Sequence, residues 1–202
     1  MNKLIALSCW LLLSFPIAAQ EEAPALFIEN RDFSILSNPQ PQLPELILVF
    51  WYGSESSYQV YGALADWAVD QPITLWPAIF RESWRPAGKL AIIANNLNLD
   101  SGQQLSLFET LLSYDVQWQD KDSFYRLLSP YVDDKEVLDR AIRDTMVFNQ
   151  LNQIQKSISH YPISGVPTII FKGKYIVNAQ QAGTSVRLIQ ILDHLIHQEL
   201  LL

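Results

Sequence analysis

The sequence contains a single cysteine, Cys9, which lies inside an apolar stretch near the N-terminus. Leu4 to Phe15 is nearly all apolar, it follows Lys3, and it is closed by Pro16 and small residues. This pattern is typical of a cleaved secretory signal peptide, which we place at residues 1–19. An uncleaved anchor is the alternative, although the apolar run is shorter than the roughly 20 residues of a membrane span. After cleavage, the mature chain has no disulfide, no thiolate nucleophile and no cysteine metal ligand.

Basic residues and histidines are also few. The 14 lysines and arginines are outnumbered by 21 aspartates and glutamates, which gives a formal net charge of −7. Non-specific nucleic-acid binding needs clustered Lys and Arg, so this balance argues against a nucleic-acid partner. Of the three histidines, His194 and His197 have the spacing of one helix face, but two ligands do not make a metal site. The sequence therefore predicts no metal and no other cofactor.

Serine hydrolase chemistry finds little support in the sequence. A hydrolase needs a serine, a histidine, a carboxylate and an oxyanion hole together. No Gly-x-Ser-x-Gly elbow occurs in the chain. His160 precedes the Gly165–Thr168 turn and could approach Ser54, which makes hydrolysis a minor alternative.

Several segments have the composition of strands. Glu45–Tyr52 is a continuous apolar run without alternation, which predicts a central strand buried on both faces. Ile73–Phe80 is a second strand, with Pro77 at an edge or irregularity. A shorter strand is expected at Phe33–Leu36, before a proline-rich connection. Near the C-terminus, Lys172-Gly173-Lys174 connects the strands of a hairpin, expected at Thr168–Phe171 and Tyr175–Val177.

Helical periodicity fills most of the remaining chain. Apolar residues recur at helical spacing over Tyr58–Val69, after a run of serines suited to a helix start. The stretch from Arg81 to about His160 predicts three to five helices, with Lys135–Ile158 as its last helical segment. Ala179–Gly183 leads into a final amphipathic helix. The order of elements indicates an α/β sheet interrupted by a helical insertion.

Two motifs carry a resemblance to a known family. Gly165-Val166-Pro167-Thr168 before a strand resembles the cis-proline loop of the thioredoxin superfamily, and residues 166–178 are similar to the DsbA branch. Phe50 to Gln59 stands where that family has an aromatic strand end, Cys-x-x-Cys and Tyr-Gln. The resemblance implies a thioredoxin fold with a helical insertion domain, the fold of DsbA. We expect a loose mature N-terminus at 20–32, a thioredoxin-like domain at 33–80 and 160–202, and an insertion at 81–159.

The chain departs from the family at the redox site. By the resemblance, Ser54 stands in place of the nucleophilic cysteine and Ser57 in place of the resolving one. A serine hydroxyl is essentially un-ionised at neutral pH and forms no exchangeable bond to sulfur. The family's buried glutamate maps to Leu48, and its buried lysine maps near Leu75 or Trp76. Because a buried charge is costly, its loss is expected where redox tuning no longer matters.

A peptide-binding groove does not depend on the cysteines. In thioredoxin-like proteins, the cis-proline exposes the backbone of the preceding residue, here Val166, to an extended substrate by strand addition. Glu55 is expected to complement the helix dipole, with a contact to a cationic group of a partner as the alternative. The resemblance implies that the groove is formed by Trp51, Tyr52, Gly53, Glu55, Ser56, Tyr58, Val166 and Pro167.

The sequence leaves three functions open. The first is a redox-inactive DsbA-like periplasmic protein that binds extended or unfolded polypeptide as a chaperone or assembly factor. The second is thiol–disulfide interchange by family membership, which needs a cysteine that the mature chain lacks. The third is a structural role, such as a subunit of an envelope complex. None of the three involves nucleic acid, and none requires membrane insertion after signal cleavage.

Overall fold

The computed structural model describes residues 27–69, 71–118 and 122–201, and its centre is a five-stranded mixed sheet. The strand order is β1-β5-β4-β2-β3, in which only β2 and β3 pair in parallel. The predicted signal peptide and Cys9 lie outside the described residues. The strands are β1 (Ser34–Ile35), β2 (Leu46–Phe50), β3 (Ile73–Pro77), β4 (Thr168–Phe171) and β5 (Tyr175–Asn178).

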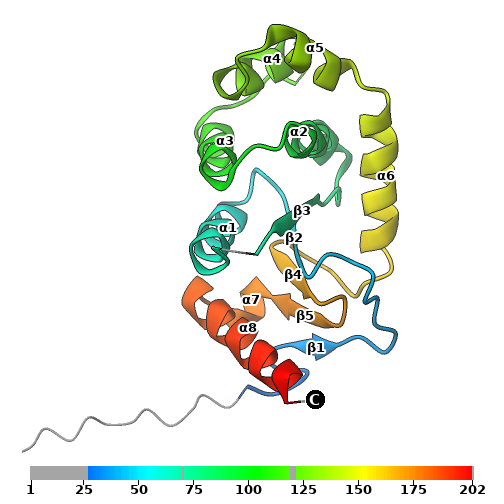
Figure 1. Ribbon diagram of the computed structural model, residues 1–202, viewed down its shortest axis with the longest axis vertical. Helices are drawn as coiled ribbons and strands as arrows, with labels where there is room; N and C mark the ends of the chain where they lie inside the picture. The colour runs from blue at the N-terminus through cyan, green and yellow to red at the C-terminus, as the bar shows by residue number, and fades with distance from the viewer. Residues whose placement is uncertain (1–26, 70, 119–121, 202) are drawn as a thin grey trace, which may run out of the picture.

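Helices make up most of the chain between β3 and β4, as Figure 1 shows, and no strand is assigned to the described residues there. Short 3-10 turns at Glu82–Trp84 and Ser129–Tyr131 accompany them. Within the described ranges, no helix has the length and apolar character needed to cross a membrane. The helices are α1 (Glu55–Trp67), α2 (Arg85–Asn96), α3 (Ser101–Ser113), α4 (Ser123–Leu128), α5 (Lys135–Arg143), α6 (Met146–Ile158), α7 (Ala179–Ala182) and α8 (Ser185–Leu200).

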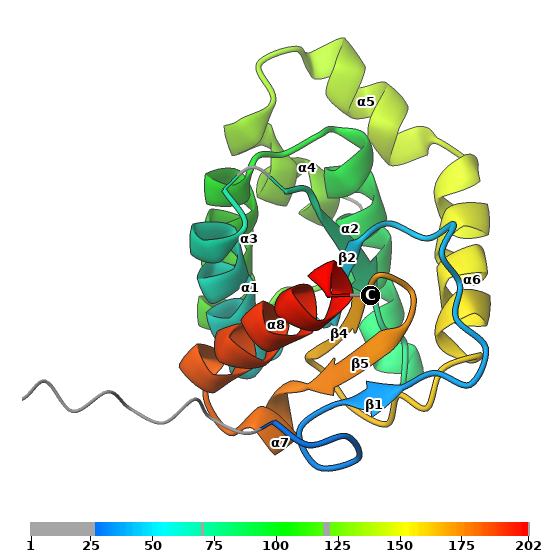
Figure 2. The ribbon, with the colours of Figure 1, turned by 60° about the horizontal axis from the view of Figure 1, so that its bottom comes forward.

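The two faces of β2 carry separate parts of the core. Leu46, Leu48 and Phe50 belong to a large apolar cluster that includes buried residues of α1, α2, α3 and α8. Ile47 and Val49 face the opposite side, where Ile158 of α6 belongs to the same smaller cluster. Figure 2 shows α8 crossing over the sheet and α6 along the other flank. The prediction of a central strand buried on both faces is thus confirmed, and Pro77 lies on the edge strand β3.

The helical segment expected at Lys135–Ile158 is two helices. The chain leaves the helical conformation at Asp144, with φ −62° and ψ 116°, and resumes it at Met146. The Asp144 carboxylate accepts a hydrogen bond from the Met146 amide at 2.8 Å. An aspartate competes in this way for backbone amides, which explains why the apolar spacing alone missed the break.

A buried carboxylate fastens the N-terminal segment to α8. Asp32, whose side chain is 4% exposed, accepts hydrogen bonds from the Ile28 amide at 2.9 Å and from the guanidinium of Arg187 at 2.6 Å. Arg31 donates a further bond at 2.9 Å. Burial alone would raise the pKa of this carboxyl, but the hydrogen bonds from Arg31, Ile28 and Arg187 outweigh burial and lower the pKa to about 2. The charged form of Asp32 therefore stabilises the fold.

Asp32→Asn is expected to lower the free energy of unfolding by about 1–3 kcal/mol near neutral pH. The uncharged amide oxygen of asparagine accepts weaker hydrogen bonds from the two arginines than the carboxylate does. The pKa of Asp32 is lower in the folded chain, so its contribution is present above the unfolded value of 3.8 and is lost as pH falls toward about 2. Urea unfolding of both proteins across this range measures the effect. If the native protein and Asp32→Asn differ in unfolding free energy by the same amount at neutral pH and near pH 2, this explanation is wrong.

Candidate functional site

The start of α1 holds the two serines in structural hydrogen bonds. Ser54 is the N-cap, and its Oγ accepts from the Ser57 amide at 3.1 Å. Ser57 is fully buried, and its Oγ accepts from the Trp51 amide at 3.5 Å. A serine cap of this kind stabilises a helix by about 1 kcal/mol. The serines therefore serve the backbone at the position where the family resemblance places the redox pair.

No histidine supplies a base to these serines through any hydrogen bond of the described part of the chain. The Nδ1 of His160 is bonded to the Lys156 carbonyl at 2.6 Å, and that of His197 to the Asp193 carbonyl at 2.7 Å. His194 packs beside the ring of Phe27, with a centroid distance of 5.3 Å. Residues 27–69, 71–118 and 122–201 also hold no cluster of three potential metal ligands. Among the described residues, Ser54 and Ser57 therefore have no hydrogen-bonded histidine.

An uncharged row of side chains lies behind the start of α1. In the sheet, Leu48 is paired with Leu75 on one side and with Ile169 on the other. All three are buried in the large apolar cluster. Trp76 belongs to the smaller cluster on the opposite face, so Leu75 is the neighbour of Leu48. The two positions to which the resemblance maps the family's buried glutamate and lysine are therefore both apolar in the structure.

Two tryptophan rings stack beside the start of α1. The rings of Trp51 and Trp84 are nearly parallel, with an angle of 5° and a centroid distance of 4.1 Å. A Cβ on Gly53 would lie 2.4 Å from the Trp51 ring, so glycine is needed for this close approach. Phe80 tilts onto Trp84 with a centroid distance of 5.9 Å. No motif connects Trp84 with this site, because an isolated tryptophan in a sequence is usually a core residue.

Tyr52 is not part of an exposed groove, and the prediction that it lines one is wrong. Its side chain is 1% exposed, and its hydroxyl donates to Gln104 of α3 at 2.8 Å. Strand alternation explains the error, since Tyr52 continues the face of Leu48 and Phe50 and packs on the same cluster. The half-buried Tyr58 likewise reaches the insertion, where its hydroxyl bonds to Glu109 at 2.5 Å.

Tyr52→Phe tests the burial of this polar pair. The substitution is expected to lower the free energy of unfolding by about 1–3 kcal/mol, because it leaves the buried Gln104 amide without its donor. Tyr131→Phe is the matched control, since its hydroxyl contacts the exposed Ser106. Urea unfolding curves measure both. A smaller loss for Tyr52→Phe than for the control would contradict the assignment.

A cavity of about 320 Å³ lies between α1 and the proline loop, and we call it the Pro167 cavity. It brings together Ser56 and Pro167, two of the predicted groove residues, whereas Trp51, Gly53 and Glu55 lie outside its lining. None of its lining residues is charged. The lining residues that the sequence did not predict belong to α1 and to the α7–α8 corner. The full lining is Ser56, Gln59, Val60, Pro167, Ala179, Gln180, Gly183, Thr184 and Ser185.

The backbone next to Pro167 is open for pairing. The Val166–Pro167 peptide bond is cis. The amide and the carbonyl of Val166 make no hydrogen bond to any described residue, although Gly165 accepts from the Thr168 hydroxyl at 2.9 Å. Val166 is half-buried and precedes β4 directly. The loop thus offers one free donor and one free acceptor beside the Pro167 cavity.

The sheet order, the cis proline before β4 and the helices between β3 and β4 define a thioredoxin fold with a helical insertion. The thiol:disulfide interchange protein DsbA of Burkholderia cepacia is 29% identical over 202 residues, which span 93% of this chain and 94% of that protein. The crystal structure of Pseudomonas aeruginosa DsbA superposes with a TM-score of 0.76 at 22% identity, over 86% of this chain and 94% of that one.

A third similar protein was solved with a ligand. A cysteine-to-serine variant of Proteus mirabilis DsbA, in complex with a non-covalently bound peptide, has a TM-score of 0.67 at 17% identity. The alignment covers 88% of this chain and all of that one. No protein-family model matches the chain. The chain is a DsbA-like member of the thioredoxin superfamily, and its single cysteine is consistent with a degenerate site. The resemblance places Ser54 and Ser57 where the family has its cysteines.

Proposed function

We propose that this DsbA-like protein is a redox-inactive periplasmic protein that binds extended or unfolded polypeptide, in a chaperone or assembly role. The observation that carries the proposal is the unpaired backbone of Val166 beside the Pro167 cavity. An extended peptide can pair with this amide and carbonyl by strand addition, which needs no thiol. The peptide complex of the Proteus mirabilis variant supports the idea, because that binding is also non-covalent.

The chemistry of the Pro167 cavity indicates what a bound segment presents. Hydroxyl and amide groups of Ser56, Gln59 and Gln180 line it beside the apolar Val60 and Pro167. Such a surface accepts small polar or apolar side chains without desolvating a charge on the protein. Main-chain pairing supplies affinity that does not depend on sequence. This combination suits a protein that binds many unfolded chains with modest affinity.

Two other functions would require different features of the chain. Thiol–disulfide interchange is the activity named for the relatives, but after the predicted cleavage the chain has no cysteine. A structural subunit of an envelope complex would use a fixed surface and would not need the free backbone of Val166. The absence of a cysteine after the predicted cleavage separates the proposal from interchange, and binding of an unfolded chain at the Pro167 cavity separates it from a structural role.

Fluorescently labelled, cysteine-alkylated α-lactalbumin is a suitable unfolded probe, with binding followed by anisotropy. Ser56→Trp, which fills the Pro167 cavity from the first turn of α1, is expected to weaken binding by about tenfold or more, because a blocked interface loses its main contacts. Gln153→Trp on the exposed side of α6 is the control and is expected to bind normally. Equal binding by both variants, or no binding by the native protein, would overturn the proposal.

A further inference from the structure

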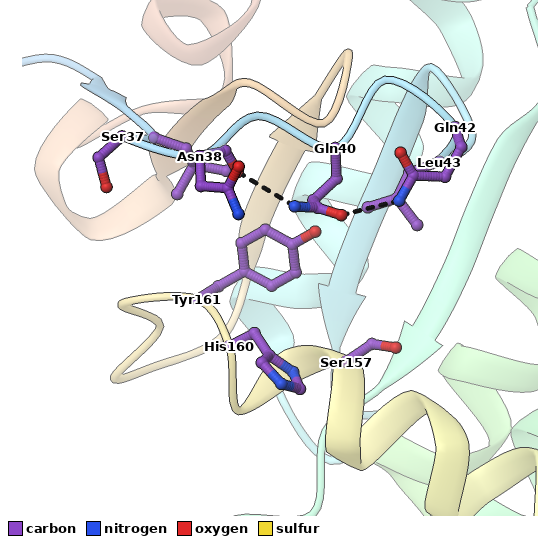
Figure 3. Close-up of a pocket in the computed structure, with 9 residues that line it drawn as sticks. Ser37, Asn38, Gln40, Gln42, Leu43, Ser157, His160 and Tyr161 are labelled. Carbon is purple, nitrogen blue, oxygen red and sulfur yellow. Dashed lines mark hydrogen bonds between the residues drawn. The ribbon is translucent and has the colours of Figure 1, made fainter.

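A second cavity, of about 370 Å³, lies away from the Pro167 cavity and shares no lining residue with it. Figure 3 shows its two walls, which are the connection between β1 and β2 and the end of α6. Its volume is within the range of sites that hold small molecules. We call it the amide cavity, and its lining is Leu36, Ser37, Asn38, Gln40, Gln42, Leu43, Ser157, His160 and Tyr161.

The lining is rich in neutral hydrogen-bonding groups. Three side chains carry amides and three carry hydroxyls, while none is Asp, Glu, Lys or Arg. Amides and hydroxyls both donate and accept. The Tyr161 hydroxyl points toward Gln40 (Figure 3), and it makes no hydrogen bond within the described residues. The Asn38 side-chain amide is also unpaired within them, so the cavity holds unused capacity for hydrogen bonds.

The wall formed by the β1–β2 connection is fixed in place. The Gln42 amide donates to the Gln40 side chain at 2.7 Å, and Gln40 donates to the Asn38 carbonyl at 3.3 Å. The Gln40 backbone amide is bonded to the Gly173 carbonyl at 2.8 Å. Gly173 has φ +57°, and a Cβ there would lie 2.1 Å from the Gln40 carbonyl oxygen, so only glycine permits this contact. A ligand would therefore meet a preformed surface and would not have to order it.

The same contacts argue against a peptide ligand. The backbone amides of Leu36 and Gln40 are already paired with the hairpin between β4 and β5. This wall consequently presents side chains instead of a free strand edge, and strand addition requires such an edge. A phosphate or carboxylate would find no lysine or arginine among the lining residues, with His160 as the only side chain there that can become cationic, and an amine would find no carboxylate.

We propose that the amide cavity binds a neutral saccharide. A sugar carries neighbouring hydroxyl or acetamido groups that donate and accept, which matches the amides of Asn38 and Gln42 and the hydroxyl of Tyr161. Its C–H face is apolar, and the Tyr161 ring together with Leu36 and Leu43 offers a complementary surface. The proposal does not depend on polypeptide binding at the Pro167 cavity.

Saturation-transfer NMR and calorimetry with cellobiose and di-N-acetylchitobiose test this proposal on the intact protein. We expect millimolar binding that Tyr161→Ala weakens by about tenfold or more, because the ring and the hydroxyl are both lost. Tyr114→Ala is the matched control, since Tyr114 is 71% exposed and lies outside the amide cavity. Asn38→Ala, in the connecting segment, gives a second test if Tyr161→Ala does not fold, and it is expected to weaken binding about threefold or more.

A charge introduced into the amide cavity gives an independent test of saccharide binding. Asn38→Asp keeps the size of the side chain and places a carboxylate in the amide cavity. This variant is expected to bind neutral sugars more weakly and glucosamine more tightly, because the ammonium group of glucosamine can pair with the carboxylate. The proposal is overturned if neither disaccharide transfers saturation, if Tyr161→Ala and Asn38→Ala both bind them like the native protein, or if triglycine binds there and the sugars do not. Unfolded α-lactalbumin should bind Tyr161→Ala normally, which separates this outcome from a failure at the Pro167 cavity.

Discussion

The purified mature protein is expected to reduce insulin, and to oxidise a dithiol peptide, no faster than a protein-free blank. Both reactions require a thiolate that attacks sulfur and leaves again, and the only cysteine of the chain lies in the predicted signal peptide. The hydroxyl groups of Ser54 and Ser57 are instead held in the cap of α1. Turbidity of reduced insulin and fluorescence of a dithiol peptide measure the two reactions, with Burkholderia cepacia DsbA as the positive control.

The double variant Ser54→Cys with Ser57→Cys extends this prediction. The Ser54 Oγ lies 3.1 Å from the Ser57 amide, so two thiols at these positions would be neighbours at a helix N-terminus, where thiol pKa values are lowered. We expect activity above the blank but well below that of the positive control. Leu48 and Leu75 provide neither of the buried charges that the resemblance implies for active members. Activity of the native protein above the blank would contradict the redox-inactive assignment, whatever the double variant does.

Much of the fold was predictable because its signals are local. The unbroken apolar run around β2, the turn at Lys172-Gly173-Lys174 and the serines before α1 each mark their own element. The break at Asp144 was missed because a local hydrogen bond between a side chain and the backbone outweighs apolar periodicity at a single residue. The strands β1, β2 and β3 were predicted one to three residues too long at one or both ends, since apolar residues such as Tyr52 continue into the core after the sheet pairing ends. The bounds of β4 were predicted as observed, and β5 extends one residue further, to Asn178.

The site was only partly predictable. Ser56 and Pro167 were expected together because the family resemblance ties α1 to the proline loop, and the structure places them in one cavity. Gln59, Gln180 and Thr184 carry no motif, and only the packing of α7 and α8 against α1 brings them there. The stacking of Trp84 on Trp51 likewise depends on a contact between segments 33 positions apart in the printed sequence, which composition cannot reveal.

Leu48→Glu is expected to lower the free energy of unfolding by about 3–5 kcal/mol near neutral pH, the effect of an uncompensated buried charge. Leu48 is fully buried at the centre of the sheet, between the apolar Leu75 and Ile169. Leu48→Gln is the matched control, because it has nearly the same shape and cannot ionise. Urea unfolding of both variants, followed by circular dichroism at several pH values, measures the difference.

The pH dependence follows from the state of the introduced carboxyl. Burial would raise its pKa in the folded protein above the unfolded value of about 4.3. Below that value the carboxyl group is protonated in both the folded and the unfolded chain. The unfolding free energy of Leu48→Glu should then be close to that of Leu48→Gln. As pH rises from about 4.3 through the folded pKa, the unfolded chain releases its proton more readily, and the loss of stability grows. A constant difference between the two variants from acid to neutral pH would contradict this account.

A second substitution tests whether the neighbouring position can hold the partner charge. Leu75 is paired with Leu48 in the sheet and belongs to the same apolar cluster, so Leu75→Lys brings an ammonium group next to the new carboxylate. We expect the double variant Leu48→Glu with Leu75→Lys to lose about 1–3 kcal/mol less unfolding free energy than the two single variants lose together. The reason is that each buried charge then has a partner. Trp76→Lys, on the opposite face, should show no such coupling. Coupling at Leu75 alone would mean that the sheet still has the geometry for a buried ion pair and that only its charged residues are missing.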